Sequence, residues 1–241
     1  MQVVSIISTK GGVGKTTTAA NLGGLVADAG LRVLLLDLDV QPTLSSYYEL
    51  GHRAPGGTYE LLAFNERDLG QFVSRTIITG LDLVLSNDHR GELNTLLLHA
   101  PDGRLRLRHL LPVLAPLYDL VLIDTQGARS VTLEMAVLAS DIALSPVTPE
   151  ILAARELRRG TMQLLEDIAP YRHLGIEPPL LHRSLSARRD ARPAGASGRV
   201  PPAPGQSRPC RARHHARPRW RAVSAMAAPI CRSVQSPTIP S

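Results

Sequence analysis

A glycine-rich stretch near the amino terminus, Thr9 to Thr17, restricts the possible folds more than any other part of the chain. Its sequence is TKGGVGKTT. The stretch follows a short apolar run, Gln2 to Ser8, and leads into a helical pattern from Lys15 to Ala29 that Gly30 ends. A glycine loop between a strand and a helix is the setting in which backbone N–H groups bind phosphate.

The rest of the first 177 residues alternates apolar runs with helical patterns. The expected strands are Arg32 to Leu36, Leu81 to Leu85, Leu120 to Ile123 and Ile142 to Val147. The expected helices are 105–117, where Pro112 and Pro116 mark potential interruptions, and 150–168. Strands without polar alternation are typical of parallel sheets buried on both faces. The sequence therefore predicts an α/β fold, a doubly wound, mostly parallel sheet flanked by helices.

The residue types in the loop match the requirements of nucleotide binding. The predicted cofactor-binding residues are Gly11, Gly12, Val13, Gly14, Lys15, Thr16 and Thr17. The glycines let successive N–H groups turn toward phosphate oxygens, while Lys15 would reach the β- and γ-phosphates. The Thr16 hydroxyl would bind Mg²⁺, and the helix N-terminus adds partial positive charge. The alternative is a plain glycine turn.

The distribution of lysine supports the functional alternative. Of the 27 basic residues in the chain, 25 are arginine, and the two lysines are Lys10 and Lys15. A preference for arginine elsewhere that spares these two positions indicates that both need an ammonium group.

Lys10 precedes the glycine pair, and Thr9 stands where an ordinary Walker A motif has its first glycine. In both respects the loop resembles the deviant Walker A motif of the ParA/MinD/nitrogenase-reductase family. The resemblance implies a P-loop ATPase that binds ATP and Mg²⁺ and forms a homodimer on ATP binding. It also implies that Lys10 reaches the partner's nucleotide and is catalytic.

The second expected strand ends in LDLDVQP, residues 36–42, which resembles the family's Asp-x-Asp-Pro-Gln motif with Val40 at the usual proline position. The resemblance implies that Asp39 is catalytic and positions the attacking water, and that Asp37 lies near the metal. The alternative for each aspartate is a cap of the following turn.

A third motif, residues 118–127, resembles the family's Walker B segment and would bring Asp124 to the metal. The predicted metal-binding residues are Thr16, Asp37 and Asp124. Gly127 is either a γ-phosphate switch or a turn glycine. Residues 141–150 resemble the segment that approaches the base in ParA-like proteins.

The sequences of these motifs favour the ParA branch of the family. Two absences agree: residues 1–182 contain no cysteine for the cluster of a reductase, and the tail offers no amphipathic membrane helix of the MinD kind. This branch implies a cytoplasmic, nucleoid-associated ATPase that segregates DNA, with nonspecific DNA and a ParB-like protein as partners and no membrane. The absence of a long apolar run or an export signal agrees. Two alternatives remain: a nucleotide-binding module with little hydrolysis, and a positioning ATPase for a non-DNA cargo.

The composition changes near residue 178. Residues 1–182 hold 15 basic and 20 acidic residues, a net charge of −5, whereas Arg183 onward holds 12 arginines and Asp190 alone, a net charge of +11. We therefore predict an ATPase domain at 1–177 and a disordered Arg/Pro/Ala-rich tail at 178–241.

The tail has two interpretations. A reading-frame shift near codons 177–185 would truncate the fold at its C-terminal end, remove the next strand and leave a sheet edge open. A genuine arginine-rich arm would instead bind nucleic acid. In the tail, Cys210 and Cys231 fit no metal or redox spacing, and neither His214-His215 nor Trp220 has partners that indicate a site.

Overall fold

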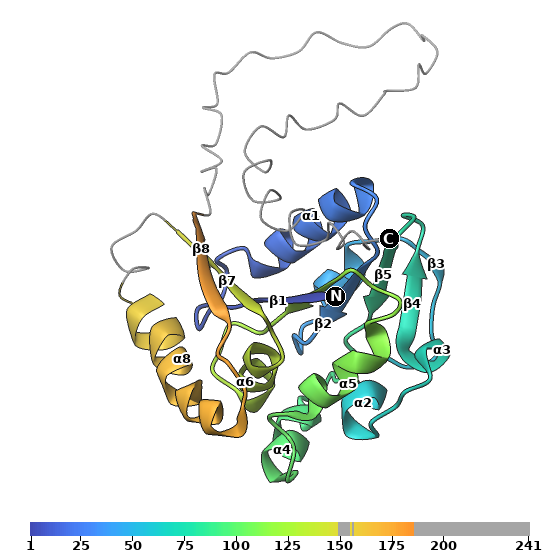
Figure 1. Cartoon of the computed structure of the whole chain (residues 1–241). Coiled ribbons are helices and arrows are strands. Elements are labelled where there is room, and N and C mark those ends of the chain that lie inside the picture. Colours follow the sequence, from blue (N-terminus) through green and yellow to red (C-terminus); the bar gives the residue numbers. More distant parts are fainter. Residues whose placement is uncertain (149–154, 156, 186–241) are drawn as a thin grey trace, which may run out of the picture. The chain divides into compact units, whose positions relative to one another are not determined.

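The structure, a computed structural model, describes residues 1–148, 155 and 157–185, and a mostly parallel sheet organises them (Figure 1). Its strands are β1 (Gln2–Ile6), β2 (Val33–Asp37), β3 (Leu50–His52), β4 (Val73–Thr76), β5 (Leu81–Val84), β6 (Leu120–Asp124), β7 (Ile142–Val147) and β8 (Leu180–Leu185). The strand order is β3-β4-β5-β2-β6-β1-β7-β8. All pairs are parallel except β3–β4 and β4–β5, which are antiparallel. The predicted fold class is confirmed.

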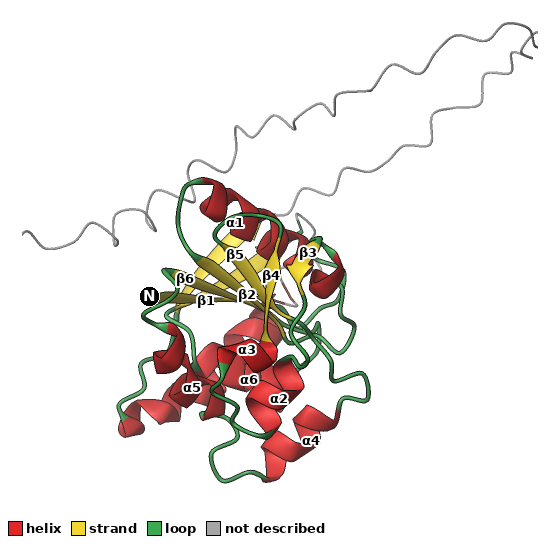
Figure 2. Cartoon of the chain, turned by 90° about the vertical axis from the view of Figure 1, so that its right-hand side faces the viewer, coloured by secondary structure: helices red, strands yellow, loops and turns green. Residues whose placement is uncertain are grey.

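Helices cover both faces of the sheet (Figure 2). They are α1 (Lys15–Asp28), α2 (Thr58–Ala63), α3 (Leu69–Phe72), α4 (Glu92–His99), α5 (Arg106–Leu114), α6 (Val131–Leu138), the π-helix η2 (Leu157–Met162) and α8 (Gln163–Ile168), with short 3₁₀ turns η1 (Leu44–Ser46) and η3 (Ala169–Leu174). Helix α1 lies on one face, and α2, α4, α5 and α6 lie on the other. Pro112 lies inside α5 without ending it.

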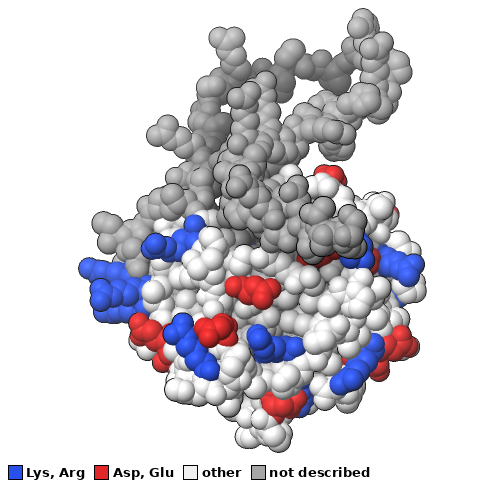
Figure 3. Space-filling view, in the orientation of Figure 1, with Lys and Arg blue, Asp and Glu red and all other residues white. Residues whose placement is uncertain are grey.

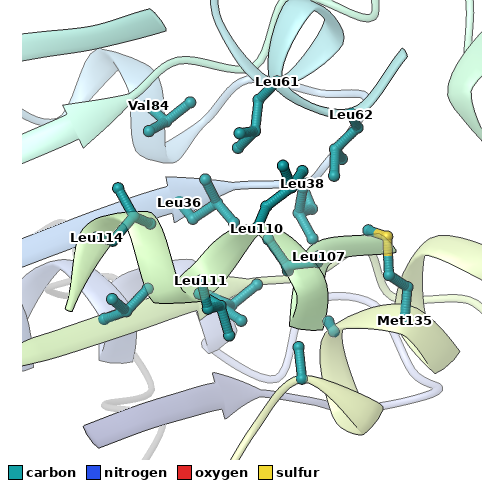
Figure 4. Close-up of a cluster of buried hydrophobic side chains, with 14 of the residues drawn as sticks. Leu36, Leu38, Leu61, Leu62, Val84, Leu107, Leu110, Leu111, Leu114 and Met135 are labelled. Carbon is teal, nitrogen blue, oxygen red and sulfur yellow. The ribbon is translucent and has the colours of Figure 1, made fainter. Parts of the chain in front are cut away.

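Strand β2 shows why its sequence lacks polar alternation. Leu34 and Leu36 belong to the core beneath α5 and α6, whereas Val33 and Leu35 belong to the core beneath α1, and all four are fully buried. Leucines of α2 and α5 fill the first of these cores (Figure 4). Gly23 lets α1 approach closely, because a Cβ there would lie 2.7 Å from Leu35 Cδ2. The two cores hold the carboxyl ends of the central strands in fixed positions.

Strand β8 corrects the expectation that the next strand is missing. It pairs in parallel with β7 from Ile142↔Leu180 to Val147↔Leu185. The β7 edge is therefore covered. The segment resembles no buried strand because it is an edge strand, where exposed polar residues such as His182 and Arg183 are tolerated.

Several predictions concern residues outside the described part of the chain. These are the tail from residue 186 onward, including Cys210, Cys231, His214, His215 and Trp220, and positions 149–154 and 156 of the helix expected at 150–168. The described part of that helix is residue 155, which is helical, and η2 followed by α8. Among the described residues, no helix has the length and apolar character needed to cross a bilayer.

Candidate functional site

The glycine loop connects the carboxyl end of β1 with the first residue of α1, as predicted. Gly12 (φ 70°) and Gly14 (φ 91°) adopt the left-handed conformation that favours glycine, and Gly14 occupies the N-cap position of α1. The Thr18 hydroxyl donates a 2.8 Å hydrogen bond to the Gly14 carbonyl and fixes the first turn. The loop is therefore wrapped around the positive end of a 14-residue helix.

A cavity of about 650 Å³ lies between this loop and the carboxyl ends of β2 and β6. Its lining consists of Gly11, Gly12, Gly14, Lys15, Thr16, Thr17, Asp39, Val40, Gln41, Thr43, Gln126, Gly127 and Ala128. Both the volume and the position at the carboxyl ends of parallel strands are typical of ligand sites. Of the predicted cofactor-binding residues, Val13 alone is absent from the lining, and it is buried behind the loop.

Lys15 is the cation of this cavity. It is only 6% exposed, and burial lowers its pKa, while the nearby carboxylates of Asp124 and Asp39 act in the opposite direction. Its Nζ lies 3.5 Å from the Lys10 carbonyl oxygen, a long contact. The two predicted acids and the predicted lysine, from three separate motifs, are therefore close enough to interact.

Asp124 ends β6 and is fully buried. Burial raises its pKa to about 7, the charges of Asp37 and Asp39 add to this effect, and the Thr16 hydroxyl and Lys15 oppose it. Although Thr16 is near enough to affect the pKa, neither carboxylate oxygen has a hydrogen bond of good geometry within the described residues. A buried acid without hydrogen bonds is costly and is characteristic of functional sites.

Asp37 and Asp39 have different environments. The fully buried Asp37 carboxylate accepts hydrogen bonds from the Ser45 N–H and hydroxyl, both at 2.8 Å, and from the Asp39 N–H at 3.2 Å. Burial nevertheless raises the pKa of Asp37 to about 6. Asp39 accepts one hydrogen bond at 3.0 Å from the Gln41 N–H and lines the cavity.

Two serines that the sequence analysis did not consider hold this aspartate pair. The Ser86 hydroxyl donates to the Asp39 carbonyl at 2.6 Å, and the Ser45 hydroxyl accepts from the Ser86 N–H at 2.9 Å. Because Ser45 and Ser86 come from segments separate from that of Asp39, no local pattern in the sequence identifies the two serines.

Lys10 lies on the other side of the loop and does not line the cavity. It borders a space of only about 10 Å³ with Val13, residues 145–148 at the end of β7, and Leu157 and Thr161 of η2. Its N–H donates to the Ser8 hydroxyl at 3.1 Å. The structure thus places the two lysines of the loop in different environments.

Gly127 packs against the glycine loop. A Cβ on it would lie 2.7 Å from Gly11 Cα and 2.8 Å from Gly11 N, so this close approach requires glycine. Its role as a γ-phosphate switch stays a prediction. Of the segment expected near the base, residues 141–148 are described, and Pro149 and Glu150 lie outside the described residues.

The residues around the cavity fit a nucleotide with its metal better than a metal alone. Among the described residues, no three His, Cys, Asp or Glu side chains form a group able to hold a metal ion. Magnesium, however, usually takes only one or two protein ligands together with phosphate and water oxygens. The Asp124 oxygens without hydrogen bonds, beside Thr16 and Lys15, fit that arrangement.

Comparison with known proteins agrees with the motifs. A family model described as an AAA domain matches residues 1–174. The sporulation initiation inhibitor protein Soj of Bacillus subtilis is 29% identical over 168 residues, which cover 69% of this chain and 64% of that protein. The chromosome partitioning protein ParA of Myxococcus xanthus is 31% identical over 160 residues, covering 66% and 56%. The chain thus spans about 60% of the length of these two curated relatives.

Among solved structures, cobyrinic acid a,c-diamide synthase from Mycobacterium smegmatis, with bound ADP and magnesium, superimposes with a TM-score of 0.68. It is 26% identical, and the match covers 77% of this chain and 74% of that one. The family match extends over most of the chain and includes all three motifs around the cavity. The chain belongs to the ParA/MinD family of P-loop ATPases.

Proposed function

We propose that this chain is a Mg²⁺-dependent ATPase of the ParA type, which forms an ATP-bound homodimer and takes part in the segregation of plasmid, chromosome or mobile-element DNA. One observation carries the proposal. Lys15, Asp39 and Asp124 come from three separate motifs, and they meet beside a cavity of about 650 Å³ that the glycine loop lines on one side.

Each residue has a role that its environment supports. The loop N–H groups and Lys15 bind the phosphates, and Thr16 and Asp124 hold Mg²⁺, which when bound neutralises charge on the phosphate oxygens. Asp39, which lines the cavity and accepts a hydrogen bond from the Gln41 N–H, orients the attacking water. Asp37 accepts three hydrogen bonds, and we propose that it contributes to the metal shell through its charge.

Lys10 is the residue that would require a second copy of the chain. Because it borders the end of β7 rather than the cavity, it is available to neutralise phosphate charge in a facing protomer. A protein named for chromosome partitioning among the relatives supports nonspecific DNA and a ParB-like stimulatory protein as partners. Such a protein would be cytoplasmic and nucleoid-associated.

Steady-state phosphate release from MgATP tests the proposal. We expect Lys10→Ala to lower the rate by about 100-fold, because a charge that acts in the transition state is lost. MgATP affinity should change by less than about threefold, because uniform binding is kept. Arg53→Ala, at an exposed position outside the cavity, is the control. Equal background rates in wild type and Lys10→Ala would instead identify a nucleotide-binding module without hydrolysis.

The cargo requires a separate experiment, because the fold does not specify it. Acidic and basic side chains are interspersed on the face that Figure 3 shows, so a DNA-binding surface is not evident there. We expect retention on nonspecific DNA with ATP and none with ADP. Loss of this difference would favour a positioning ATPase for a non-DNA cargo.

A further inference from the structure

The π-helix η2 contains a glycine that faces the start of the glycine loop. A Cβ on Gly160 would overlap the Thr9 hydroxyl oxygen and would lie 2.7 Å from Thr9 Cβ and 3.0 Å from Thr9 Cγ2. Gly160 is not among the residues with positive φ, so its backbone conformation does not call for glycine. Glycine is required at this position because Thr9 occupies the space that a side chain would need.

Thr9 stands where an ordinary Walker A loop has its first glycine. The loop therefore carries extra volume at residue 9, and η2 lacks a side chain at the position that faces it. Glycine inside a helix is unfavourable, and π-helical turns occur frequently at functional sites. Both observations suggest that this contact is retained for a purpose other than the stability of η2.

The surroundings of the contact leave little room for adjustment. Thr161 is 1% exposed, and together with Lys10 and Val13 it borders a space of about 10 Å³, which is about the least that holds one water. Close-packed interiors transmit displacements rather than absorb them. A shift of η2 would therefore move the start of the loop.

We propose that Gly160 is a positioning residue, which fixes the start of the glycine loop through Thr9 and thereby sets the position of Lys10. This inference rests on the proposed function for its kinetic consequences. Lys10 follows Thr9 directly, so displacement of Thr9 moves the attachment point of the catalytic lysine and the N–H groups that follow. Helix η2 is then part of the support of the nucleotide site.

The test compares wild type with Gly160→Ala, Thr9→Gly and the double variant. We expect Gly160→Ala to weaken MgATP binding by at least about fivefold and to lower the melting temperature, because overpacking displaces the loop. An ordinary helical glycine would show the opposite thermal effect, a rise of about 2–4 °C with alanine. In the double variant, Thr9→Gly should restore both MgATP affinity and melting temperature, because it removes the atoms that the new Cβ would meet.

A kinetic split separates positioning from general stability. Gly160→Ala should lower kcat in the wild-type background and have no further effect on kcat in Lys10→Ala, because the lysine whose position it disturbs is then absent. Gly24→Ala is the matched control, since among the described residues a Cβ at this position inside α1 would meet the Tyr48 hydroxyl alone, at 3.3 Å. It should leave affinity and kcat unchanged.

Two results would overturn the inference: a Gly160→Ala protein with a raised melting temperature and unchanged affinity, or a defect that persists fully in the double variant. If Gly160→Ala does not fold, the double variant decides, since recovery of folding supports the contact and continued failure refutes it. If wild type does not bind MgATP, the proposed function fails, while the melting temperatures of the four proteins still test the contact.

Discussion

One aspartate precedes strand β6 and another is its last residue, and the two have opposite environments. Asp119, just before the strand, accepts hydrogen bonds from the Arg32 N–H at 2.9 Å and from the Arg32 guanidinium at 2.8 and 3.1 Å, which lower its pKa to about 2. Asp124, at the carboxyl end, is buried and has no well-formed hydrogen bond to any described residue, and its pKa is raised to about 7.

The contrast extends to the neighbouring strands. At the amino end, the Tyr118 hydroxyl donates to Asp82 at 2.8 Å, so the acid at the start of β5 also has a partner. At the carboxyl end, burial raises the pKa of Asp37 as well. One end of the sheet thus contains acids whose partners stabilise the fold. The other contains acids whose burial the fold compensates only in part, which is expected of a site that binds a cationic or metal-bearing ligand.

The largest effect should come from removing the cation at the carboxyl end. Lys15→Ala should weaken MgATP binding by about 100-fold, or ~3 kcal/mol, because it removes the proposed charge-assisted contact to phosphate from a buried site. Isothermal titration calorimetry measures this loss. Arg32→Ala, at the opposite end, is the comparison and should leave the affinity unchanged. Equal losses in both variants would remove the functional distinction between the two ends.

Asp124→Asn should separate function from stability. We expect the free energy of unfolding of the apoprotein at pH 8 to rise by roughly 1–3 kcal/mol, because a buried charge without hydrogen bonds is removed. MgATP affinity should fall by at least about tenfold, because the proposed metal ligand is lost. Urea denaturation and calorimetry measure the two quantities. A variant that loses stability at this pH would show that the Asp124 charge is compensated in the apoprotein.

The pH dependence of stability should differ between the two ends. The raised pKa values of Asp37, about 6, and Asp124, about 7, mean that the folded protein holds protons which the unfolded chain has released above pH ~4. Their contribution to stability is complete below pH ~4 and is lost as the pH rises through 6 and 7. The melting temperature of the apoprotein should therefore fall between pH 5 and pH 8, and Asp124→Asn should flatten the curve.

Asp119 contributes to the pH dependence of stability with the opposite sign. Because its pKa is lowered, its stabilisation is present above the unfolded value near pH 4 and is lost as the pH falls toward 2. Asp119→Asn should destabilise the protein by about 1 kcal/mol at pH 7, since exposed ion pairs contribute little, and should leave MgATP affinity unchanged. Urea denaturation at pH 7 and pH 3 measures the difference, which should shrink at pH 3. A reduced affinity would contradict the separation between the two ends.

The sequence was sufficient to predict the central strands. β1, β2, β5, β6 and β7 lie within about two residues of their expected positions, because strands buried on both faces are continuous apolar runs. The sequence analysis did not predict the edge strands β3 and β8, nor β4, which lies between β3 and β5. Leu50–His52 and Leu180–Leu185 mix leucine with exposed glycine, histidine and arginine, since an edge strand needs no apolar residue at every position.

For the candidate site, the sequence predicted the residues with distinctive chemistry and missed those that support them. Lys15 is recognisable from the glycine loop, and Asp39 and Asp124 are recognisable from the resemblance of their segments to the family's motifs. Ser45 and Ser86, which hold the aspartate turn, are ordinary serines in the sequence, and their role depends on contacts between segments far apart in the chain. Gly160 is equally inconspicuous until its neighbour Thr9 is known.

The strand order also bears on how the chain folds during synthesis. β1 is the first strand made, yet both of its neighbours come late: Gln2 pairs with Leu120, and Val4 pairs with Ile142. At ~5–20 residues per second, a ribosome takes roughly 6–24 s to produce the partner of Gln2. The motif that most clearly marks this protein therefore emerges first, and the glycine loop gains its complete surroundings only when η2 has been made.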